Sequence, residues 1–105
     1  MEREPGLTEA AELFKVLGSE ARLGLLRIIE QEPRTVSALA ESTGMSQPLV
    51  SQHLRTLRQA DLVTATRHGK EMHYEITDRH VSHVIADAMS HVLEPAPAGP
   101  SEKKL

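Results

Sequence analysis

Residues 35–59 read TVSALAESTGMSQPLVSQHLRTLRQ, and this stretch decides the fold. Its apolar positions predict a short helix over 36–41 and a longer helix over 47–59. Gly44 suits the tight turn between them, and Ser46 is a suitable N-cap for the second helix. Two helices joined by a short turn that contains glycine are the pattern of a helix-turn-helix.

The helix over 47–59 has an apolar face and a polar face. The apolar side chains, which we expect to face inward, are Leu49, Val50, Leu54 and Leu57. The polar face carries residue types that suit a DNA major groove: amides that pair with adenine edges, an arginine for guanine or phosphate, and hydroxyls for phosphate oxygens. The expected DNA contacts on this helix are Ser46, Gln47, Ser51, Gln52, His53 and Arg55.

A β-hairpin is expected directly after this helix. Residues 62–67 are rich in β-forming types, residues 71–76 alternate, and Gly69 between them can supply the positive φ of a tight turn. The residues at the tip that we expect to reach a neighbouring minor groove or the DNA backbone are Arg67, His68 and Lys70. A hairpin appended to a helix-turn-helix makes a winged helix.

Three further helices flank this unit, because apolar residues recur at helical spacing over 7–17, 20–31 and 79–93. The expected fold class is therefore mainly α with a β-hairpin wing. The expected organisation is a disordered lead over 1–6, one DNA-binding and dimerisation domain over 7–94, and a disordered tail rich in Pro, Ala and Gly over 95–105.

Composition narrows the function classes. A length of 105 residues indicates a single domain with a modest core, which an obligate dimer would supplement. The formal net charge is −3, but cations gather over 51–70, where Asp61 is the only acid, so a local basic patch can bind phosphates. The chain has no cysteine, which excludes disulfides, thiolate catalysis and cysteine-based metal sites.

The chain shows no segment for membrane insertion or export. No apolar run approaches the ~20 residues of a membrane span, and the first residues, MEREP, are too polar for a signal peptide. We therefore expect a cytoplasmic protein.

The last helix and its two ends carry imidazoles and carboxylates, namely Asp78, His80, His83, Asp87, His91 and Glu94. On a helical wheel these residues line one edge of the apolar stripe formed by Val81, Val84, Ile85, Ala88 and Val92. His80 and His91 are about 16 Å apart along the axis, too far to share one ion. Two antiparallel copies of the helix can complete the site, because Asp78 and His80 of one chain then meet His91 and Glu94 of the other, giving two equal sites.

The donor set also bears on which metal would bind. Two nitrogens and two carboxylates suit tetrahedral Zn²⁺, which is the expected effector. Ni²⁺ and Co²⁺ prefer six donors, and His83, Asp87 or the N-terminus could supply the extra ones, so these two ions are the alternatives.

Several segments of this chain resemble the ArsR/SmtB family of metal-sensing winged-helix repressors. They are FKVLGSEARL over 14–23 followed by Leu25 and Leu26, MSQPLVSQHLRTL over 45–57, Leu62-Val63, and RHGK over 67–70. The resemblance covers nearly all of residues 7–94. It implies a homodimer built from the first and last helices and a palindromic DNA operator.

The resemblance also implies a subtype. The family's site on the last helix follows a spacing that Asp78, His80, His91 and Glu94 match without departure. The family's other common site uses cysteines on the helix before the turn, where residues 35–39 have none. The resemblance thus implies a regulator whose apo dimer binds its operator, and whose DNA affinity a divalent metal at the dimer interface modulates.

Three alternatives remain open. A metal-dependent hydrolase would need a general base in a cleft, and neither a His-Glu-x-x-His motif nor residues for a substrate pocket are evident. A winged helix used only for protein contacts does not explain the polar, basic reading face. The third alternative is a repressor that responds to a non-metal signal and whose histidines are structural. Titration with metal distinguishes it from a metal sensor.

Overall fold

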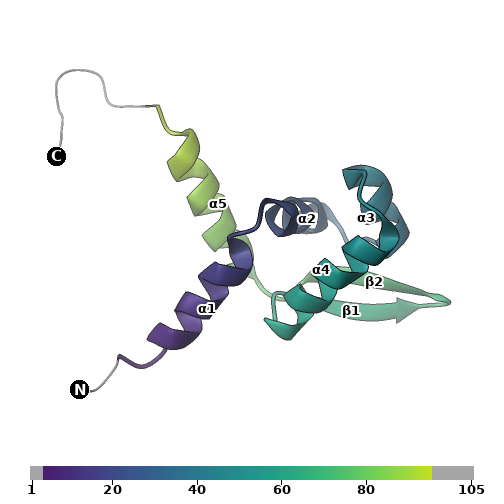
Figure 1. Ribbon diagram of the computed structural model, residues 1–105, viewed down its shortest axis with the longest axis horizontal. Helices are drawn as coiled ribbons and strands as arrows, with labels where there is room; N and C mark the ends of the chain where they lie inside the picture. The colour runs from purple at the N-terminus through teal and green to yellow at the C-terminus, as the bar shows by residue number, and fades with distance from the viewer. Residues whose placement is uncertain (1–3, 96–105) are drawn as a thin grey trace.

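The computed structural model describes residues 4–95, and its elements follow the expected order (Figure 1). The elements are α1 (Leu7–Leu17), α2 (Glu20–Gln31), α3 (Val36–Thr43), α4 (Gln47–Gln59), β1 (Val63–His68), β2 (Glu71–Ile76) and α5 (Arg79–Leu93). The winged helix-turn-helix is therefore confirmed. Residues 1–3 of the expected lead and 96–105 of the expected tail lie outside the described residues.

Side-chain caps explain where α2, α3 and α4 begin. The hydroxyl oxygens of Ser19, Thr35 and Ser46 each accept a hydrogen bond from the backbone N–H three residues further on, at 3.2, 3.1 and 3.3 Å. Each such cap stabilises its helix by about 1 kcal/mol. Gly44, at φ 78°, ends α3 in the left-handed conformation, and its N–H donates to the Ala40 carbonyl.

The core lies beneath α2, α3, α4 and the base of the hairpin. Its buried members are Leu17, Leu25, Leu26, Ile29, Leu39, Val50, Leu54, Leu57, Leu62, Val63 and Ile85. Helices α1 and α5 contribute one buried residue each, Leu17 and Ile85. Figure 1 shows both helices extending away from the body at the end opposite the wing. The terminal helices are thus attached to the core at one end and uncovered along most of their length.

The wing is an antiparallel hairpin in which Val63 pairs with Ile76 and His68 with Glu71. Gly69, at φ 65°, makes the turn. The segment between α2 and α3 joins the hairpin through an isolated antiparallel β-bridge. The backbone N–H of Arg34 donates to the Tyr74 carbonyl at 3.1 Å, and the Arg34 carbonyl accepts from the Tyr74 N–H at 2.8 Å. This bridge, which the sequence did not indicate, fixes the wing to the helical body.

Three expected details were wrong. Leu49 does not face inward: it is 40% exposed, because the buried row of α4 is Val50, Leu54 and Leu57, and Leu49 belongs to the flanking row. Helix α3 runs two residues beyond the expected end, to Thr43, whose hydroxyl donates to the Leu39 carbonyl. Strand β1 begins at Val63 and includes His68, since Leu62 is held in the preceding turn by a bond from its N–H to the Leu57 carbonyl.

Candidate functional site

Helix α4 presents the expected reading face on a rigid support. Val50, Leu54 and Leu57 bury its inner side almost completely. The expected DNA-contacting residues Ser46, Gln47, Ser51, Gln52 and Arg55 are exposed, whereas His53 is half-buried between the two faces. The hydroxyl oxygen of Ser46 is already used as the helix cap.

The wing presents Arg67, His68 and Lys70 to solvent. An Arg67 Nη atom donates to the Gly69 carbonyl at 3.4 Å across the turn. The His68 ring lies 4.6 Å, centroid to centroid, from the ring of His73 on β2. His73 is not among the expected DNA contacts, although strand alternation and the hairpin register place it on the same face as His68.

Asp78 and His80 lie together at the start of α5. Asp78 is the N-cap, and its Oδ1 accepts hydrogen bonds from the backbone N–H groups of His80 at 2.8 Å and Val81 at 3.4 Å. The same oxygen is 3.4 Å from His80 Nδ1, and the His80 side chain is 95% exposed. The cap therefore places a carboxylate and an accessible imidazole side by side.

His91 and Glu94 lie together at the other end of α5, both exposed. They line one shallow cavity with Asp87, Ser90 and Leu93. Asp87 and His83 are the two side chains expected as extra metal donors. Asp87 lines this cavity beside His91, whereas His83 is exposed elsewhere on the helix.

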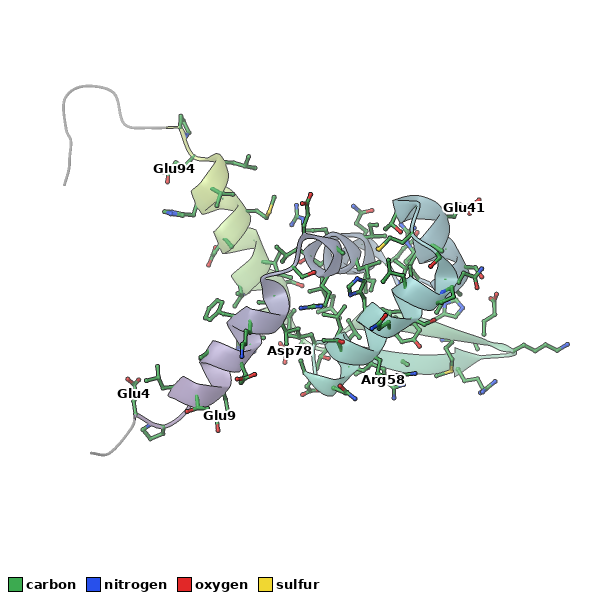
Figure 2. The ribbon with its side chains drawn as sticks, viewed as in Figure 1. Glu4, Glu9, Glu41, Arg58, Asp78 and Glu94 are labelled. Carbon is green, nitrogen blue, oxygen red and sulfur yellow. The ribbon has the colours of Figure 1, made fainter. Side chains whose placement is uncertain are left out.

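A single chain does not assemble these donors. Figure 2 shows Asp78 and Glu94 at opposite ends of α5. Within residues 4–95 no three His, Asp or Glu side chains are grouped closely enough to hold a metal ion. One chain thus carries two candidate half-sites, each made of one imidazole and one carboxylate.

Helices α1 and α5 also expose apolar side chains. On α5 the last fully buried residue is Ile85, Met89 is only partly buried against the core, and Val92 is 69% exposed. On α1, Phe14 is 60% exposed and Leu7 is also exposed. Within the described part of the chain, no helix is both long and apolar enough to cross a membrane.

Comparison with known proteins agrees with this architecture. Residues 19–65 match the family model described as bacterial regulatory protein, arsR family. The chain is 37% identical over 90 residues to the HTH-type transcriptional repressor SmtB of Mycobacterium tuberculosis, covering 86% of this chain and 67% of that repressor. It is 37% identical over 75 residues to a probable mercury resistance operon repressor of Streptomyces lividans, covering 71% of this chain and 60% of that protein.

A solved structure extends the similarity to the whole fold. The homodimeric winged helix-turn-helix DNA-binding domain of Mb0332 from Mycobacterium bovis superposes with a TM-score of 0.82 at 26% identity, covering 98% of each chain. The present chain is accordingly a winged helix-turn-helix DNA-binding regulator and not an enzyme. By sequence and by fold, the chain belongs to the ArsR family of bacterial regulatory proteins.

Proposed function

We propose that this regulator is a metal-responsive repressor that acts as a homodimer. The observation that carries the proposal is the division of α5 into two half-sites, Asp78 with His80 and His91 with Glu94, at opposite ends of one exposed helix. An antiparallel pair of such helices joins the two kinds of half-site twice, by symmetry.

Uncovered apolar surface supports the dimer. Phe14 on α1 and Val92 on α5 each expose most of their side chain. Burial of apolar surface contributes about 25 cal/mol per Å². A dimer in which the second copy covers both helices would therefore be stabilised. The M. bovis neighbour is itself described as homodimeric.

The donor chemistry fits a divalent cation of the zinc type. Asp78, His80, His91 and Glu94 would hold it, since neutral imidazole and carboxylate are ordinary zinc ligands. When bound, the ion supplies a cross-link between the two copies of α5. Ni²⁺ or Co²⁺ would use more donors, and Asp87, which shares the cavity of His91, is better placed for this than His83. The chain has no cysteine, so it cannot build a mercury site from thiolates.

The DNA partner we propose is a palindromic operator in the cytoplasm. A two-fold dimer would place its two copies of α4 in successive major grooves, about 34 Å apart. The glutamines of α4 would read base edges, and Arg55 would reach a guanine or a phosphate. Arg67 and Lys70 of the wing would contact the adjacent minor groove or backbone.

A short path of backbone hydrogen bonds supports coupling between the two functions. The Thr77 N–H, one residue before the cap of α5, donates to the Leu62 carbonyl at 3.1 Å. The Leu62 N–H donates in turn to the Leu57 carbonyl in α4 at 2.9 Å. A shift of α5 caused by metal would therefore reach α4 through a few rigid contacts, and DNA would weaken metal binding by the same factor.

The test is a titration of the metal-free dimer with Zn²⁺ and, separately, Ni²⁺, while the anisotropy of a labelled palindromic fragment from its own promoter is followed. We expect one ion per chain and at least a tenfold loss of DNA affinity, about 1.4 kcal/mol of coupling. Tight metal binding without any change in DNA affinity would overturn the switch. If neither metal affects DNA binding, the regulator answers a non-metal signal and the histidines are interface residues.

A further inference from the structure

A cavity of about 400 Å³ lies between α4 and the wing, and it includes residues that are not among the DNA contacts expected above. Its lining residues are Ser51, Arg55, Arg58, Gln59 and Tyr74. Ser51, Arg55 and Arg58 lie at positions i, i+4 and i+7 of α4, so they share one face of that helix. The lining contains two guanidinium groups, two hydroxyls and one amide, and no acid.

The two guanidinium groups in this cavity are unpaired. Other arginines of the chain have partners: Arg22 donates to the Val16 carbonyl, Arg27 pairs with Glu30 and Arg34 pairs with Glu32. In contrast, neither Arg55 nor Arg58 has an ion pair or a side-chain hydrogen bond within residues 4–95. Two like charges three residues apart on a helix repel each other. The cavity is therefore a place where an anion would be stabilised.

Tyr74 forms the opposite wall from a fixed position. Its backbone makes both hydrogen bonds of the bridge to Arg34, and its side chain packs against the core. The phenolic hydroxyl has no hydrogen-bond partner among the described residues, so it is free to donate. The wall thus adds a neutral donor that is held by the hairpin rather than by α4.

The place of the cavity points to one kind of anion. In double-stranded DNA, a sugar-phosphate backbone separates the major groove from the adjacent minor groove. If α4 enters the major groove and the wing reaches the minor groove, that backbone must cross the space between them. Figure 2 shows Arg58 on α4 where this helix passes over the strands of the wing.

We propose that Arg55, Arg58 and Tyr74 form a seat for a phosphodiester group of the DNA backbone. Arginine suits this role because its planar fork donates two parallel hydrogen bonds to phosphate oxygens. The seat adds Arg58 and Tyr74 to the DNA-contacting residues and gives Arg55 a phosphate rather than a base. This inference rests on the DNA-binding part of the proposed function and not on the metal site.

The first test compares Arg58→Gln with Arg27→Gln, which removes the same charge from α2, away from the cavity. We expect R58Q to weaken binding about tenfold for operator and unrelated duplex alike, and to lower the slope of log affinity against log salt concentration by about one. R27Q should stay within about twofold of the wild type in affinity, with its salt slope unchanged. Arg58→Lys keeps the charge but not the fork, so it should restore the salt slope while recovering the affinity only in part.

The second test locates the phosphate with duplexes that carry one neutral methylphosphonate at successive positions. One position should weaken the wild type and leave R58Q unaffected, because the contact is already lost. Tyr74→Phe should lose about threefold at the same position, with an unchanged melting temperature. If R58Q matches R27Q, or if every methylphosphonate weakens both proteins equally, the seat is wrong. A wild type that fails to bind duplex DNA would instead overturn the proposed function itself.

Discussion

Asp78 serves two purposes at the start of α5, and the two can be separated by substitution. Its Oδ1 accepts the N-cap hydrogen bonds, and its carboxylate belongs to the proposed metal set. We expect Asp78→Ala to lower the free energy of unfolding by about 1 kcal/mol, because it removes the cap. Asp78→Ser keeps a cap oxygen, so chemical denaturation should show nearly wild-type stability while metal affinity falls. Equal stability of both variants would contradict the capping role.

His91 and His83 form a matched pair on one helix, since both are exposed imidazoles and only His91 lies beside Glu94. Loss of an outer-shell partner already costs a metal site 10–100-fold, so removal of a ligand should cost about 100-fold or more. We expect His91→Ala to lose Zn²⁺ affinity by that amount in competition with a chromophoric chelator, and to keep the DNA affinity of the metal-free protein. His83→Ala should keep both, and an equal loss in the two variants would remove His91 from the set.

At the scale of the element, the two leucines at 49 and 54 distinguish the inner row of α4 from its flank. Leu54 is 1% exposed and belongs to the buried core, whereas Leu49 is 40% exposed. We expect Leu54→Ala to lower the free energy of unfolding by 2–5 kcal/mol, the usual range for a buried leucine. Leu49→Ala should cost less than about 1 kcal/mol. The measurement is urea denaturation of both variants, and similar losses would restore Leu49 to the core.

The wing shows how an element gains a role from its attachment. A hairpin of two short strands is only marginally stable by itself. The bridge between Arg34 and Tyr74 ties β2 to the helical body, and Leu62 and Val63 bury the start of β1. The wing is thus held at its base and free at its tip, which is the arrangement that a DNA-reaching arm needs.

At the scale of the whole molecule, we expect the terminal helices to form the dimer interface. A charge placed on their uncovered apolar surface should prevent the dimer, because burying an unpaired carboxylate costs several kcal/mol. We expect Val92→Glu to sediment as a monomer and to lose tight operator binding and metal binding together. Ser42→Glu, the same charge on the exposed side of α3, should remain a dimer. A dimeric V92E with normal metal binding would show that α5 does not form the interface.

Features that depend only on neighbours along the chain could be predicted before the structure was known. Each of the caps at Ser19, Thr35 and Ser46 needs only a side chain and an N–H three residues away, and helical or strand periodicity needs only the order of apolar residues. For this reason the order and most of the bounds of the elements were predicted. The proposed half-sites of α5 rest on the same kind of local pattern, because their members are two or three residues apart.

Features that depend on distances between elements became apparent only in the folded chain. The exposure of Leu49, the bridge from Arg34 to Tyr74 and the contact of His68 with His73 all follow from how helices and hairpin are placed in space. The cavity that joins Arg58 of α4 to Tyr74 of the wing has the same origin. Packing is a sum of contacts between residues far apart in sequence, and no local pattern encodes which of them meet.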